Sequence, residues 1–298
     1  MGMKKKIMLI RNAHIMPFQG TMDRFMSGVF QNGVCLEESL IRKRASPSSI
    51  MEPTKKLAGA YLYGGYLFGH FGHFCLESLS RAYAFRQSAL LPILFVSPNN
   101  TIATWQRYIF KFLGFSNELI LLDEPVEVEQ LVFSVDGCTI EPPCIIDEQL
   151  AALAVRSFAA DAPCADKVWL SRSATTGGGL ENEIEIEAAL EQIGWTIVHP
   201  EKYPIAEQVR VIASARHVAG IDGSAFYSAL FAKKINGHFT LFSRFRGVPP
   251  MLRHALSCKN IPFDNVRDLP LELVSGVNAE CRYILKKPEC IINRLRHL

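Results

Sequence analysis

Short apolar runs alternate with amphipathic segments in the second half of the chain, and this alternation predicts alternating strands and helices. Strands are expected at 168–170, 195–198 and 217–221, and helices at 181–193, 204–215 and 225–234. Three strand–helix units in succession predict a doubly wound parallel sheet. Such sheets bind their ligands at the carboxyl ends of the strands.

The first half alternates less regularly. The pattern predicts helices at 70–86 and 101–113, and short strands at 93–96, 119–122 and 126–133. A small, polar segment at 159–167 marks a boundary between two α/β domains, an amino-terminal one at 1–162 and a carboxy-terminal one at 163–298. For the basic end of the chain two alternatives stay open: a last helix that packs back on the amino-terminal domain, or a basic patch near a membrane surface.

Composition narrows the class of protein. The 298 residues are 49% hydrophobic, which is typical of a globular protein with a full core and excludes a disordered one. The net charge of +3 argues against a nucleic-acid binder. No run reaches the ~20 apolar residues of a membrane helix, and the start of the chain lacks a signal-peptide core. We therefore expect a cytoplasmic protein with no nucleic-acid partner. The eight cysteines form no C-x-x-C pair, which favours free thiols over a zinc or redox site.

The expected helix at 70–86 carries the first candidate site. His70, His73, Glu77 and Arg81 fall on one helical face, opposite a set of apolar positions, Phe71, Cys75, Leu76, Leu79 and Ala82. His73 and Glu77 are i,i+4 neighbours that can form a hydrogen bond, an arrangement that tunes a general base. Two alternatives stay open: an ordinary solvated helix face, and a metal site built on the two histidines and Glu77. The latter lacks the H-E-x-x-H spacing.

The second candidate site combines two turns of the expected parallel sheet. Gly223, Ser224 and Ala225 lie between a strand and a helix, where backbone amides can bind a phosphate or diphosphate. Arg172 follows the strand at 168–170, and its guanidinium matches phosphate oxygens. Glu207 begins a helix, where it is either a capping residue or an acceptor for a ribose hydroxyl. The alternatives are a structural turn and a surface arginine, and neither the G-x-G-x-x-G nor the Walker A spacing is present.

These motifs occur in an order that resembles glycosyltransferase family 61, known from bacterial capsular and cell-surface polysaccharide loci. The amino-terminal motif is Gly69-His70-Phe71-Gly72-His73-Phe74-Cys75-Leu76-Glu77-Ser78-Leu79-Ser80-Arg81. The carboxy-terminal motifs are Trp169-Leu170-Ser171-Arg172, Glu181-Asn182-Glu183, Gly194-Trp195, Val198-His199-Pro200-Glu201, Glu207-Gln208 and Gly220-Ile221-Asp222-Gly223-Ser224-Ala225. The resemblance covers residues 60 to 235.

The resemblance implies a GT-B fold, in which two Rossmann-like domains with parallel sheets face a cleft. It implies an inverting glycosyltransferase that moves a sugar from a nucleotide-sugar donor to a glycan acceptor, without a metal or a further cofactor. His73 or Glu77 is then the catalytic base, and His70 and Arg81 bind substrate. The donor is bound by Arg172, Glu207, Gly223, Ser224 and Ala225, and the enzyme works in the cytoplasm or at the periphery of the inner membrane, in contact with the membrane or an assembly complex.

Four positions depart from the family pattern. Many members have His-Gly-Ala where this chain has Asp222-Gly223-Ser224, Asn at His70 and Pro at Ser80. A carboxylate beside a diphosphate is unfavourable unless it points away, so Asp222 favours an alternative function: a catalytically inactive nucleotide- or glycan-binding member of a polysaccharide assembly complex.

Overall fold

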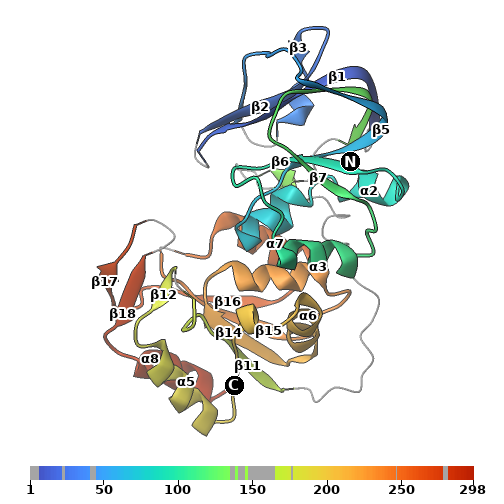
Figure 1. Ribbon diagram of the computed structural model, residues 1–298. Coiled ribbons are helices and arrows are strands. Elements are labelled where there is room, and N and C mark those ends of the chain that lie inside the picture. The colour runs from blue at the N-terminus through green and yellow to red at the C-terminus, as the bar shows by residue number, and fades with distance from the viewer. Residues whose placement is uncertain are drawn as a thin grey trace. The chain divides into compact units, whose positions relative to one another are not determined.

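The computed structural model describes residues 7–21, 24–40, 45–134, 138–139, 145–146, 165–175, 177–245, 247–277 and 281–298 (Figure 1). The chain divides into two compact units, Met1–Leu150 and Ala151–Leu298. Most of the expected boundary segment, 159–167, lies outside the described residues. In the described parts, no helix is long and apolar enough to cross a membrane.

The first unit is built on a mixed sheet. Its strands are β1 (Ile7–Gly20), β2 (Phe25–Gln31), β3 (Val34–Cys35), β4 (Ala45–Pro47), β5 (Lys55–Tyr66), β6 (Ile93–Val96), β7 (Leu119–Leu122) and β8 (Val126–Ser134). Their order is β3-β2-β1-β8-β5-β6-β7, with β4 paired to β2, and a separate short pair joins β9 (Cys138–Thr139) and β10 (Ile145–Ile146).

The expectation of parallel sheets in both domains is wrong for this unit. Strands β8, β5, β6 and β7 are parallel, but β1 is antiparallel to both β2 and β8. For the pair β1 and β2 the reason is the length of the connection. The link between β1 and β2 is too short for a crossover and forces a hairpin, whereas helical segments separate β5, β6 and β7.

The expected helix at 70–86 is broken into three pieces. Residues Phe71–His73 form α1, Phe74–Ser78 form a π-helical turn, η2, and α2 begins only at Ala82 and ends at Gln87. A π turn winds more widely than an α turn, so it rotates every later residue away from the face predicted for a regular helix. The prediction of one exposed polar face is therefore wrong: Glu77 is 1% exposed and Arg81 is fully buried. Among the described residues of this unit, the remaining helices are η1 (Glu37–Ser39) and α3 (Thr104–Phe112).

Gly64 in β5 is required by the aromatic core of this unit. A Cβ at Gly64 would overlap the ring of Phe95, which is fully buried and packs edge-on against Phe85 and Phe110. The ring has no room to retreat because its neighbours are themselves buried.

We predict that Gly64→Ala lowers the free energy of unfolding by about 1–3 kcal/mol, the usual cost of an overpacked core. Phe95→Leu makes room for the added methyl group, so the double variant should lose less stability than the two single variants added together. Urea unfolding of all four proteins measures this; strictly additive losses would contradict the contact.

The second unit contains the predicted parallel sheet, and this prediction is confirmed. Its strands are β11 (Lys167–Leu170), β13 (Thr196–Val198), β14 (His217–Ile221), β15 (His238–Phe242) and β16 (Phe263–Val266). All four pairings are parallel, in the order β13-β11-β14-β15-β16. Numbered along the chain, this is the doubly wound order 2-1-3-4-5.

Helices cover this sheet and a small second sheet flanks it. The helices are α5 (Glu183–Gln192), η3 (Pro200–Lys202), α6 (Ile205–Ser214), η4 (Ser224–Phe231), α7 (Pro250–Cys258) and α8 (Glu289–Arg296). The helix expected at 225–234 is thus the shorter 3₁₀ helix η4. Helix α8 lies beside α5 in its own unit, where Ile291 and Leu295 share a core with Ile186 and Leu190 (Figure 1). The small sheet has the order β12 (Gly179–Leu180), β18 (Arg282–Leu285), β17 (Leu271–Ser275).

Candidate functional site

The strand order of the second unit creates a switch point between β11 and β14. From these neighbours the chain continues to β13 on one side and to β15 on the other. The segments that leave their carboxyl ends therefore diverge, and the crevice between them is where doubly wound sheets bind ligands. Arg172 follows β11 and Gly223 follows β14, so the topology alone places the two predicted phosphate-binding turns next to each other.

Arg172 and Gly223 are in direct contact. The guanidinium of Arg172 occupies the space where a Cβ on residue 223 would lie. The backbone at Gly223 is extended, with φ 177°, so glycine is needed here for space and not for its conformational freedom. Arg172 also donates from Nη2 to the carbonyl oxygens of Gly177 and Gly178, at 3.1 and 3.2 Å. These bonds hold the guanidinium against the turn that begins η4, where Ser224 and Ala225 follow.

Burial, and after it the nearby charge of Arg244, lower the pKa of Arg172 to about 10. The side chain still carries its positive charge at pH 7. A buried cation beside backbone amides is well suited to an anionic ligand.

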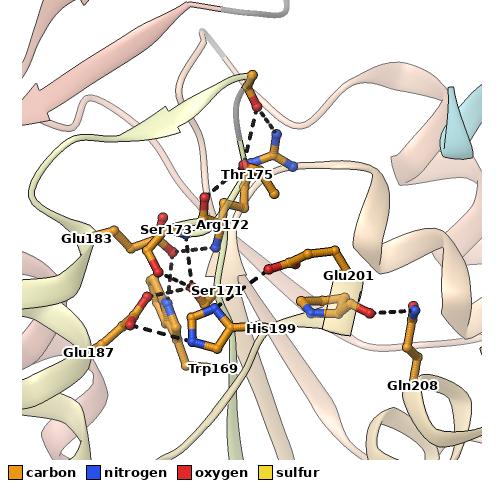
Figure 2. Close-up of polar contacts among 12 residues, drawn as sticks. Trp169, Ser171, Arg172, Ser173, Thr175, Glu183, Glu187, His199, Glu201 and Gln208 are labelled. Atoms are coloured by element: carbon orange, nitrogen blue, oxygen red, sulfur yellow. Dashed lines mark hydrogen bonds and ion pairs between the residues drawn. The ribbon is translucent and has the colours of Figure 1, made fainter. Parts of the chain in front are cut away.

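Glu183, on α5, supports the backbone of Arg172. Its Oε1 accepts hydrogen bonds from the indole Nε1 of Trp169 and from the backbone N–H of Arg172, both at 3.0 Å (Figure 2). Its Oε2 is buried and has no hydrogen-bond partner among the described residues. Burial raises the pKa of Glu183 from 4.5 to about 7, against the opposing effect of the two hydrogen bonds. Glu183 therefore fixes the backbone of Arg172, a role that its place in the sequence motif did not indicate.

A second polar chain runs along the same edge. Ser171 Oγ donates to Glu187 Oε1 at 2.5 Å, and the other oxygen of Glu187 lies 3.9 Å from His199 Nε2. His199 Nδ1 lies 3.8 Å from Glu201 Oε1, as Figure 2 shows. His199 follows β13, so the imidazole lies at the carboxyl edge of the sheet. Sequence reasoning placed His199 in a motif but gave it no role.

Glu207 and Gln208 lie in the first turn of α6. Glu207 makes an ion pair with Arg210, at 2.5 Å. Gln208 donates to the carbonyl oxygens of Pro200 and Tyr203 at 2.7 and 2.9 Å and accepts from Ser228 Oγ at 2.9 Å. Gln208 thus ties α6 to the segment after β13 and to η4. The proposed donor contact of Glu207 stays a prediction.

Asp222, which directly precedes the turn at Gly223, is not an isolated carboxylate. It is fully buried, and its Oδ1 accepts from Nε and the backbone N–H of Arg244, at 3.0 and 3.2 Å. Arg244 also donates to the carbonyl oxygen of Asp222, at 3.0 Å. The charge of Asp222 is therefore paired. Arg244 lies 22 residues away in a segment without a motif, so no local pattern indicated this pair.

The first unit brings together His73 and Glu77. His73 Nδ1 lies 3.4 Å from Glu77 Oε1, with the carboxylate buried and the imidazole side chain 40% exposed. The ring of His70 lies 5.2 Å from that of His73. The predicted His–Glu pair is therefore present, although on a π turn.

Arg81 lies in the core of the first unit. Its Nη1 donates to the carbonyl oxygen of Ser134 and its Nη2 to that of Glu38, the latter at 2.7 Å, and its guanidinium lies over the ring of Tyr63. In this position Arg81 ties β8 to the segment before β4. The proposed substrate contact of Arg81 is untested, and the visible role of the residue is structural.

The alternative of a metal site on His70, His73 and Glu77 receives no support from the geometry. Within the described ranges, no group of three or more His, Cys, Asp and Glu side chains is placed to hold a metal ion. His70, His73 and Glu77 accordingly do not form such a group.

Comparison with known families gives one match. The model of the family described as Glycosyltransferase 61 matches residues 71–237, which is more than half of the chain. The chain therefore belongs to glycosyltransferase family 61 and is a glycosyltransferase, as the resemblance implied. No curated protein matches the chain. The matched segment includes His73, Glu77, Arg172 and Gly223, whereas Arg244 and the β17–β18 hairpin lie beyond it.

The raised pKa of Glu183 predicts a specific dependence of stability on pH. Because the folded chain binds this proton more tightly than the unfolded chain does, the stabilisation is complete below pH ~4.5 and is lost as the pH rises through about 7. Glu183→Gln stays neutral and keeps an acceptor for Trp169. The wild type should therefore lose roughly 1–3 kcal/mol of unfolding free energy relative to this variant between these pH values.

Urea unfolding at several pH values measures the difference. Glu185→Gln, an exposed position on the same helix, is the matched control and should follow the wild type. Parallel pH curves for Glu183→Gln and the wild type would contradict the raised pKa.

Proposed function

We propose that this chain is an inverting glycosyltransferase of GT-B type that moves a sugar from a nucleotide-sugar donor to a glycan acceptor. The carboxy-terminal unit binds the donor and the amino-terminal unit binds the acceptor. The observation that carries the proposal is the contact of Arg172 with Gly223 at the switch point. Family membership supports sugar transfer, and two compact α/β units, the first with a mixed sheet and the second with a parallel one, are compatible with a GT-B arrangement.

The switch point suits the diphosphate of a nucleotide sugar. The missing side chain at Gly223 lets the guanidinium of Arg172 lie against this turn, so that a phosphate could be bound by the guanidinium together with the amides of Gly223, Ser224 and Ala225. As the bond between the anomeric carbon and the diphosphate oxygen breaks, negative charge develops on that oxygen. A pre-placed guanidinium and fixed amides stabilise this charge without rearrangement, so they lower the barrier more than they tighten ground-state binding.

The acceptor hydroxyl must lose its proton as it attacks the anomeric carbon from the opposite face. We assign this proton transfer to His73, with Glu77 as the residue that orients it. Nδ1 of His73 faces the buried carboxylate of Glu77, so Nε2 is the nitrogen that would take the proton. A carboxylate at this position stabilises the imidazolium that forms.

The setting that we propose is the synthesis of a capsular or cell-surface polysaccharide, at the cytoplasmic side of the inner membrane. Neither a metal nor a further cofactor takes part in this proposal. The inactive, binding-only alternative depended on an unpaired Asp222 in the diphosphate turn. Because Asp222 pairs with Arg244, it offers that alternative no support.

Nucleotide binding tests the donor site. A thermal-shift panel of UDP, GDP, CMP, dTDP and ADP should show stabilisation by one nucleotide, about 2.7 kcal/mol at 100 times its dissociation constant. Arg172→Ala should abolish the shift. Arg216→Ala, an exposed arginine at the start of β14 and so at the opposite edge of the sheet, is the control and should retain it. An unchanged shift in Arg172→Ala would remove the donor site from this position.

Turnover of the stabilising donor tests the base. His73→Ala should lower kcat about 10²- to 10⁴-fold, and Glu77→Gln should lower it by a smaller factor, with donor binding retained. His14 and Glu127 form a second His–Glu pair in the same unit, with Nε2 and Oε2 3.9 Å apart. His14→Ala is therefore the matched control. Wild-type rates in both His73→Ala and Glu77→Gln would show that this pair is not catalytic.

A further inference from the structure

A second buried arginine lies at the same edge of the sheet as Arg172. Arg244 follows β15, the strand that pairs with β14 on the side away from β11. Its side chain is only 7% exposed, which is unusual for a charged residue and needs a compensating partner. Neither the sequence motifs nor the matched segment, which ends at residue 237, includes it.

Asp222 anchors Arg244 at several points. The carboxylate Oδ1 accepts from Nε and from the backbone N–H of Arg244, and Nη2 donates to the carbonyl oxygen of Asp222. Asp222 is the residue directly before Gly223, so Arg244 is fixed to the turn whose amides bind phosphate in the proposed function. An arginine held in this way has lost its rotamer freedom before a ligand binds, which reduces the entropic cost of binding.

The two arginines lie within each other's electrostatic field. After burial, the charge of Arg244 is the largest cause of the lowered pKa of Arg172. Like charges that are held close together in a partly buried site repel, and an anion that binds both relieves the repulsion. A diphosphate has two linked phosphate groups, and each of them can accept hydrogen bonds from one guanidinium.

We propose that Arg244 is a second ligand of the donor's diphosphate and that Asp222 is the positioning residue that holds it there. The donor is then a nucleoside diphosphate sugar and not a nucleoside monophosphate sugar. This inference rests on the proposed function, since it assumes that the switch point binds the donor.

Inorganic pyrophosphate and inorganic phosphate are the probes, because they test the two-arginine site without any base or sugar. Titration calorimetry should show that the wild type binds pyrophosphate at least tenfold more tightly than phosphate. Arg244→Gln should reduce this preference by roughly tenfold or more, the effect of losing one charge-assisted hydrogen bond to a phosphate. Arg216→Gln, at the opposite edge of the sheet, should keep the preference.

Removal of Arg244 alone leaves Asp222 buried without its partner, which can unfold the chain. The double variant Asp222→Asn with Arg244→Gln removes both charges together and should fold, as near-ultraviolet circular dichroism can verify. It should show the same loss of preference. Asp222→Asn alone keeps an oxygen that accepts from Arg244, so it should retain the preference within about threefold, an outcome that separates positioning from direct contact.

Two results would overturn the inference: an unchanged preference for pyrophosphate in the folded double variant, or no preference in the wild type. The proposed function fails separately, when no nucleotide of the thermal-shift panel stabilises the wild type. If a nucleotide stabilises the wild type while Arg244→Gln leaves the pyrophosphate preference intact, the donor site stands and only the role of Arg244 is wrong.

Discussion

The parallel pairing of β11 with β14 is the constraint on which the candidate donor site depends. It places the carboxyl ends of the two strands side by side, with Leu170 opposite Gly220, so that the turns after them meet. Arg172 can lie on Gly223 only because residue 223 has no side chain. One backbone register and one glycine thus determine where the guanidinium is held.

The loop that carries Arg172 is fixed by residues far away in the sequence. Glu183 binds the backbone of Arg172 from α5, and strand β12 in the same loop pairs with β18. Arg282 adds a bond from Nη1 to the carbonyl oxygen of Thr175, at 2.9 Å, and an ion pair with Glu181. The β17–β18 hairpin lies beyond the matched family segment, yet it holds the loop on which the proposed donor site is built. Substitutions in this hairpin are therefore expected to act on the donor site through the loop.

The regular part of the fold could be predicted from the sequence, and the irregular part could not. The spacing of apolar residues predicted the strands and helices of the second unit, because buried parallel strands and amphipathic helices have clear patterns of apolar and polar positions. The π turn at Phe74–Ser78 leaves no such pattern, and it changes which side chains are buried: Glu77 and Arg81 fit a regular helical face but lie inside. The mixed sheet of the first unit was not predicted either, because a short apolar run does not indicate whether its strand is parallel or antiparallel to its neighbours.

For the candidate site residues too, local patterns predicted some positions and missed those that depend on tertiary contacts. Local motifs identified Arg172, Gly223, His73 and Glu77, since each lies in a short segment with recognisable chemistry. Arg244 and the supporting role of Glu183 depend on tertiary contacts across 22 and 11 residues, which no local pattern encodes.

The proposed function requires that the diphosphate of the donor binds at the switch point of the second unit. A crystal structure of the chain with the nucleoside diphosphate that stabilises it would test this most directly. We expect phosphate oxygens within roughly 3 Å of the guanidinium of Arg172 and of the amides of Gly223 to Ala225. A diphosphate bound away from β11 and β14, with the guanidinium still lying on Gly223 and touching no phosphate, would contradict it.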